Sequence, residues 1–132
     1  MSDQVKLDVE SLPGYLHIRT HGVWSRDTSG DFLKQLIVTI SESRQINILV
    51  DSRDLKYDSS VFSDYLATRE MELLQPPGSK RIAVVEKPEI KSNVEMFELA
   101  LRNLGINARF FFDKKEALKW LEGDDFNNNE AV

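Results

Sequence analysis

The sequence contains no cysteine among its 132 residues. This absence excludes disulfide bonds, thiolate-bound metals and a cysteine nucleophile in one step. Histidine is also scarce, with only His17 and His21. On one predicted strand they would share a face but lie roughly 13 Å apart, at ~3.3 Å per residue. That separation is too long for both to hold one metal ion, so we expect neither a metal site nor a cofactor.

Long apolar runs and basic stripes are missing as well. No apolar run approaches the roughly 18–20 residues that span a bilayer. The start of the chain, residues 1–8, lacks the basic segment followed by an apolar one that marks a signal peptide. Lysine and arginine form no cluster and no aromatic platform accompanies them, which argues against a nucleic-acid partner. We expect a cytoplasmic protein without a membrane span.

The composition is that of one ordinary globular domain. Hydrophobic residues make up 41% and charged residues 30% of a 15.2-kDa chain, which is large enough to build a core without metal or disulfide staples. The net charge of -5 is concentrated near the end. The acidic residues that follow the last predicted helix are Glu122, Asp124, Asp125 and Glu130. We predict a single domain over residues 1–122 and a flexible acidic tail over 123–132.

Apolar and polar residues alternate over residues 5–10 and again over 15–19. Alternation is typical of strands with one covered face, and Pro13-Gly14 between them suits a tight turn. The pattern predicts a β-hairpin. Apolar positions then recur at helical spacing after several capping residues, which predicts a first helix over residues 28–43.

The continuous apolar run at residues 46–50 predicts a central strand that is covered on both faces and ends on Asp51. A polar connection follows, and Asp58-Ser59-Ser60 supplies capping oxygens for a second helix that ends near Leu74. In open α/β sheets, ligands and partners commonly bind where a central strand ends and the next helix begins. We therefore predict the working surface between Asp51 and Tyr65.

The rest of the chain repeats the strand–helix alternation. Residues 82–85 predict a buried strand, and apolar residues at spacings of four and three predict a helix over 90–104 with Gly105 as its C-terminal cap. A last strand over 108–112 precedes a short helix opened by Asp113 in a capping box. The order is β-β-α-β-α-β-α-β-α, with connections long enough for parallel crossovers.

This order and several local motifs resemble the STAS superfamily, and more closely its SpoIIAA-like branch, from Val5 to Leu121. The motifs are the strand ending in Asp51, the Asp58-Ser59-Ser60 turn, the Arg81-Ile82-Ala83-Val84-Val85 strand and the Phe111-Phe112-Asp113 to Trp120-Leu121 ending. The resemblance implies an α/β fold with a mixed four- or five-stranded sheet, helices mainly on one face and no known catalytic apparatus.

The resemblance also implies a regulatory role. In the anti-sigma-factor antagonists of the superfamily, a partner kinase phosphorylates a serine at the start of the second helix, within an Asp-Ser-Ser-Gly or similar motif. Asp58-Ser59-Ser60 matches that motif, whereas Val61 replaces the glycine. Ser60, with Ser59 beside it, would then be the switch, facing a kinase or regulator. The alternative is that these residues only cap a helix. A homodimer through a strand edge or helix face is also open.

A second reading is a carrier or sensor of a lipid or other apolar small molecule, since the SpoIIAA-like branch is similar in fold to the CRAL-TRIO lipid-carrying domains. Aromatic side chains that could line an apolar pocket are Phe62, Tyr65, Trp24, Phe110 and Phe112. Ordinary core packing explains the same residues.

The third hypothesis is that the protein is an enzyme. Asp51, Arg53 and Asp54 gather ionisable groups near one strand end. No nucleophile motif, glycine-rich phosphate loop or metal motif accompanies them, so we interpret them as a solvated ion cluster and expect no catalysis.

Overall fold

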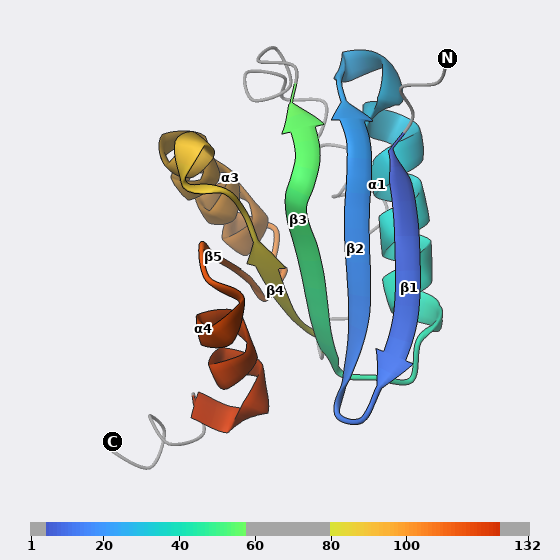
Figure 1. The fold of residues 1–132 in the computed structure, drawn as a ribbon, viewed down its shortest axis with the longest axis vertical. Coiled ribbons are helices and arrows are strands. Elements are labelled where there is room, and N and C mark those ends of the chain that lie inside the picture. The colour runs from blue at the N-terminus through green and yellow to red at the C-terminus, as the bar shows by residue number, and fades with distance from the viewer. Residues whose placement is uncertain (1–4, 58–79, 125–132) are drawn as a thin grey trace.

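A computed structural model describes residues 5–57 and 80–124, which form a five-stranded mixed sheet (Figure 1). The strands are β1 (Lys6–Leu12), β2 (Tyr15–Trp24), β3 (Asn47–Tyr57), β4 (Arg81–Val85) and β5 (Ala108–Phe111). Their order in the sheet is β1-β2-β3-β4-β5. β1 runs antiparallel to β2, and every later pair is parallel. This arrangement confirms the predicted hairpin and the predicted mixed sheet.

Helices cover both faces of the sheet unequally. The helices α1 (Arg26–Glu42) and α3 (Lys91–Asn103) contribute to one apolar core, whereas the short α4 (Lys114–Lys119) builds a smaller core on the other face. A 3₁₀ turn (Pro88–Ile90) leads into α3, and a wide turn (Trp120–Asp124) continues α4. Helices lie mainly on one face, as predicted. The predicted second helix, over residues 58–74, lies outside the described residues.

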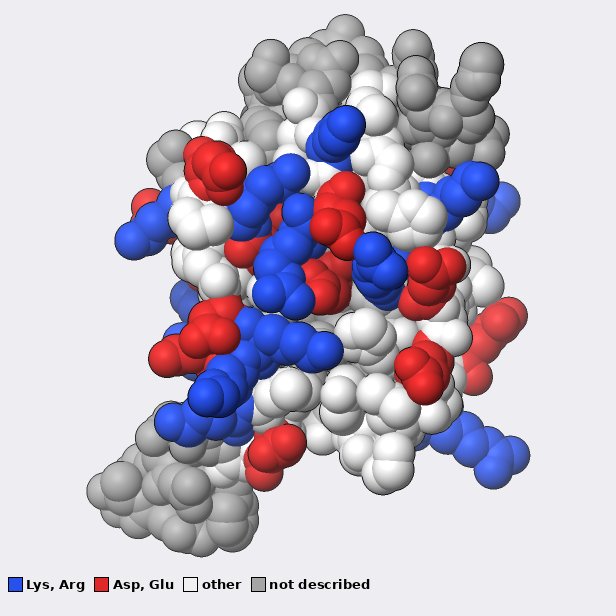
Figure 2. All heavy atoms as spheres, viewed as in Figure 1, with Lys and Arg blue, Asp and Glu red and all other residues white. Residues whose placement is uncertain are grey.

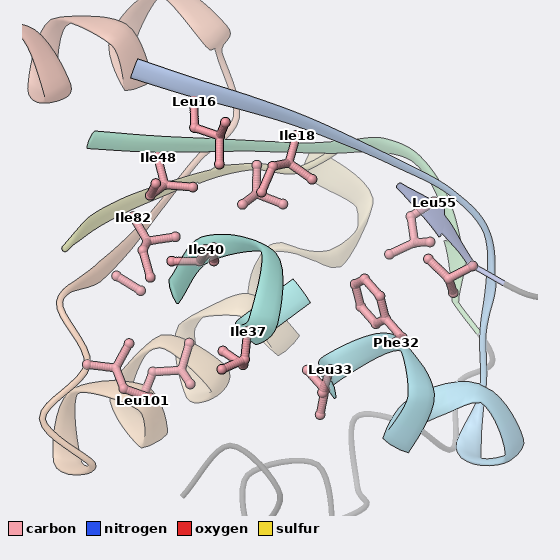
Figure 3. Close-up of a cluster of buried hydrophobic side chains, with 14 of the residues drawn as sticks. Leu16, Ile18, Phe32, Leu33, Ile37, Ile40, Ile48, Leu55, Ile82 and Leu101 are labelled. Atoms are coloured by element: carbon pink, nitrogen blue, oxygen red, sulfur yellow. The ribbon is translucent and has the colours of Figure 1, made fainter. Parts of the chain in front are cut away.

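β3 is the central strand and is covered on both sides, as its apolar run predicts. Ile48 and Val50 belong to the larger core, and Leu49 between them belongs to the smaller core under α4. None of the three side chains is more than 2% exposed. Figure 3 shows Ile48 on the sheet facing Ile40 of α1 across the larger core.

β3 is longer than the sequence predicts. The prediction that it ends at Asp51 is wrong, because pairing with β2 continues to Tyr57 after pairing with β4 has stopped at Asp51. The register shifts between Arg19 and His21, which breaks the alternation of polar and apolar residues that would reveal a strand. Residues 51–56 therefore look like a polar loop but lie in the sheet.

The predicted ends of two helices are confirmed by their local geometry. Gly105 follows α3 with a φ of +83°, and the N–H groups of Gly105 and Ile106 donate to the carbonyl groups of Arg102 and Leu101. This is the Schellman pattern, which needs a residue that tolerates positive φ. At α4, a carboxylate oxygen of Asp113 accepts a hydrogen bond from the Lys115 N–H at 3.0 Å.

We expect Asp113→Ala to lower the free energy of unfolding by about 1 kcal/mol, because the helix loses its N-terminal cap. Asp113→Asn is the matched control, since asparagine caps a helix about as well as aspartate. Urea unfolding followed by circular dichroism measures both changes. Equal losses in the two variants would show that the cap contributes nothing specific.

In residues 5–57 and 80–124, no helix is long and apolar enough to cross a membrane.

Candidate functional site

The predicted site residue Asp51 lies within β3 and is paired with a neighbour on the same strand. The Arg53 guanidinium donates to both carboxylate oxygens of Asp51, at 2.9 Å from Nε and 2.7 Å from Nη2. Burial alone would raise the pKa of Asp51, but the hydrogen bonds and charge of Arg53 outweigh it and hold that pKa below its usual value. Asp51 is thus an ionised, paired carboxylate.

A second, exposed pair lies beside it. Arg19 of β2 and Asp54 of β3 are 2.7 Å apart, and each side chain is more than half exposed. An exposed pair of this kind contributes little to stability, because water and dissolved salt screen its charges. Figure 2 shows basic and acidic side chains interspersed over this face of the sheet. In the part of this face that the structure describes, basic and acidic side chains lie next to one another (Figure 2).

The other predicted site residues fall in two groups. Asp58, Ser59, Ser60, Phe62 and Tyr65 all lie outside the described residues. Trp24 is described and is buried at the end of β2, with 5% of its surface exposed. Of the predicted pocket residues, Trp24, Phe110 and Phe112 lie in the described part of the chain.

Trp24 lies at the centre of an aromatic cluster. Its ring centroid is 5.0 Å from that of Phe32, 5.7 Å from Tyr57 and 5.8 Å from Phe97. These rings line a cavity of about 60 Å³ between the sheet and the helices α1 and α3. Phe110, another predicted pocket residue, also lines it. The cavity walls are almost entirely apolar side chains of the larger core.

One carboxyl group interrupts this apolar lining, and sequence reasoning did not single it out. Glu86 follows β4 directly and is 4% exposed, and the Tyr57 hydroxyl donates a hydrogen bond to its Oε2. Burial raises the pKa of Glu86 to about 8, although the Tyr57 hydrogen bond and the charge of Lys87 act in the opposite direction. Glu86 is therefore mostly protonated at neutral pH. Burial also raises the pKa of Tyr57, helped by the nearby Glu86.

Two buried polar atoms at this cavity have no hydrogen-bond partner within the part of the chain that the structure describes. They are Glu86 Oε1 and Trp24 Nε1. Such orphaned groups are uncommon in folded proteins and call for an explanation. A sequence signal for Glu86 exists: an acidic residue comes directly after the apolar residues of a buried strand.

Comparison with known proteins places the fold. No protein-family model and no curated protein matches the sequence. Among solved structures, an anti-sigma factor antagonist from Mycobacterium paratuberculosis superposes with a TM-score of 0.65 at 12% identity, covering 92% of this chain and 97% of that one. A protein of the DUF3478 family from Shewanella loihica PV-4, described as having a SpoIIAA-like fold, superposes with a TM-score of 0.55 at 18% identity, covering 89% and 93%.

The chain has a SpoIIAA-like fold. The resemblance noted in the sequence is therefore confirmed at the level of the fold. The coverage of both chains is nearly complete, so the SpoIIAA-like fold extends over almost all of the sequence given. At these identities the likeness concerns architecture, and function has to be argued from the residues.

Proposed function

We propose that this protein is a STAS-like regulatory domain that acts in the cytoplasm by binding another protein and has no catalytic activity. The observation that carries the proposal is the superposition on an anti-sigma factor antagonist over nearly the full length of both chains. The carboxylates of Asp51 and Asp54 agree with it, since each is paired with an arginine side chain and not arranged around a reacting centre.

The proposed contact surface begins where β3 ends. Tyr57 is the last residue of β3, so Asp58-Ser59-Ser60 follows the central strand directly. Ser60 is the proposed phosphorylation site of a partner kinase, with Ser59 as its neighbour. A phosphate adds a charge of about −1.5 to −2 and three strong acceptor oxygens. On this surface it would weaken the binding of a protein that docks on the unmodified form.

The test is phosphate mapping on protein purified from its own cells. We expect a phosphate on Ser60 that disappears in Ser60→Ala and persists in the matched control Ser59→Ala. A partner captured with the unmodified protein should bind Ser60→Asp at least about tenfold more weakly, equivalent to ~1.4 kcal/mol. An unphosphorylated Ser60 together with unchanged partner affinity of Ser60→Asp would remove the switch.

A second candidate function is the binding of a small apolar molecule, which the cavity beside Trp24 favours. Its volume of about 60 Å³ is several times the ~10–15 Å³ that one water needs. It is also far below the roughly 300–1,000 Å³ of pockets for drug-sized ligands. The lipid considered from the sequence is too large for this cavity, so the candidate ligand is a molecule of a few heavy atoms.

A further inference from the structure

We propose that the cavity beside Trp24 binds a small, mainly apolar molecule that carries a hydrogen-bond acceptor, and that Glu86 and Trp24 hold this acceptor. The proposal deepens the second candidate function and rests on it. It names the chemical class of the ligand and the two side chains that select it.

The lining of the cavity explains the apolar part of the ligand. Side chains from four strands and two helices surround the space, including Leu33 and Ile37 of α1 and Leu101 of α3. Among the described residues of its wall, the exceptions are Ser52, Tyr57 and Glu86. The Ser52 hydroxyl accepts a hydrogen bond from Thr20 at 2.8 Å. An apolar body in this space would contact apolar side chains of the sheet and of both helices.

The two buried atoms without a partner explain why the ligand should carry a polar group. A buried polar group without a partner costs roughly 1–3 kcal/mol. Glu86 Oε1 and Trp24 Nε1 are two such atoms in the described chain, and both residues line the cavity. A ligand that bonds to either atom recovers this cost, whereas a purely apolar ligand leaves it in place. Binding should therefore favour a molecule with a polar group.

The direction of the hydrogen bonds makes that group an acceptor. The indole N–H of Trp24 can only donate. The Tyr57 hydroxyl donates to Glu86 Oε2, so the proton of a neutral Glu86 carboxyl belongs on Oε1, which then also donates. Two donors select a ketone, aldehyde or ether oxygen. They disfavour an ammonium group, which can only donate.

The protonation state of Glu86 supports this polarity. Burial raises its pKa to about 8, and the charged or titratable groups of the described chain that act on it are Tyr57, Lys87 and Asp51. At pH 6.5 the carboxyl is mostly neutral and donates. At pH 9.5 it is mostly ionised, so Oε1 becomes an acceptor and repels the ligand oxygen. Affinity for an acceptor ligand should fall over this range.

The experiment compares two probes of the same shape, cyclopentanone with an acceptor oxygen and methylenecyclopentane without one. Titrations of ¹⁵N-labelled protein at pH 6.5 report on the two tryptophan indole N–H signals. We expect cyclopentanone to bind at least about tenfold more tightly and to shift the Trp24 signal. The Trp120 signal is the internal control, because Trp120 belongs to the smaller core on the other face.

Variants and a change of pH distinguish the contribution of Trp24 to binding from that of Glu86. Trp24→Phe should reduce the preference for cyclopentanone over methylenecyclopentane. Raising the pH to 9.5 should weaken cyclopentanone binding about tenfold in the wild-type protein. Glu86→Gln should abolish that pH effect, because a glutamine amide cannot ionise. The pH comparison needs no change at Trp24, so it stands even where Trp24→Phe fails to fold.

The outcomes distinguish this proposal from the function on which it rests. Equal binding of both probes would overturn selection by an acceptor and leave the apolar-ligand function intact. Binding of neither probe would overturn both, and would leave the cavity to buried water. Tighter cyclopentanone binding that does not change with pH would overturn the role of Glu86.

Discussion

Replacing Glu86 by glutamine should raise the free energy of unfolding at pH 9 by about 3–5 kcal/mol and leave it nearly unchanged at pH 4. In the folded protein, burial raises the pKa of Glu86 from 4.5 to about 8. Between these values the folded state keeps a proton that the unfolded state releases, so rising pH favours unfolding. Each pKa unit corresponds to about 1.36 kcal/mol. The stabilising effect of the bound proton is complete below pH 4.5 and lost above pH 8.

Glutamine preserves the shape of the side chain and an oxygen that can accept from the Tyr57 hydroxyl. It does not ionise, and therefore removes this pH dependence. Urea unfolding at pH 4, 7 and 9 measures the difference between the two proteins. Glu89→Gln is the matched control, because Glu89 lies three residues away and is exposed. Parallel stability curves for wild type and Glu86→Gln would show that Glu86 ionises in the folded state as it does in water.

Replacing one buried apolar side chain of β3 by alanine, on either face of the sheet, should lower the free energy of unfolding by about 2–5 kcal/mol. Ile48→Ala removes a side chain from the larger core under α1, and Leu49→Ala removes one from the smaller core under α4. Both side chains are 0% exposed. A loss of this size is a large part of the roughly 5–15 kcal/mol that stabilises a typical domain.

Ile46→Ala is the control for these truncations. Ile46 directly precedes β3 and is 57% exposed, so its change should stay within about 0.5 kcal/mol. Chemical denaturation of the three variants compares two faces and one exposed position of the same chain segment. If Leu49→Ala cost as little as Ile46→Ala, α4 would not cover the second face of the sheet in solution.

Local signals in the sequence were sufficient to predict most of the fold. The turn at Gly14, where φ is +93°, and the C-terminal cap at Gly105 were predicted because glycine tolerates positive φ. The two covered faces of β3 were predicted because an uninterrupted apolar run suits a strand without a wet side. Each of these inferences depends on residues that are neighbours in the chain.

Features that depend on distant partners were not predictable in this way. Ser52 is buried because Thr20, on another strand, donates to its hydroxyl. Glu86 is buried beside Tyr57, which lies 29 residues earlier in the chain. A polar residue in a sequence is read as exposed unless its partner is known, and these partners become visible only when the strands are aligned. Trp24 was predicted as a pocket residue, but not its orphaned indole N–H.

The order of strands in the sheet has a consequence for how the chain assembles during synthesis. Each strand pairs with the one that precedes it in the chain, so no central strand has to be inserted later between two existing ones. The β1–β2 hairpin can form first, and each new strand then adds to an edge that is already present. Every such step closes only the connection between consecutive strands, and the entropy lost in closing a loop grows with its length. The sheet can therefore grow in the direction of translation, with β5 and α4 completing it last.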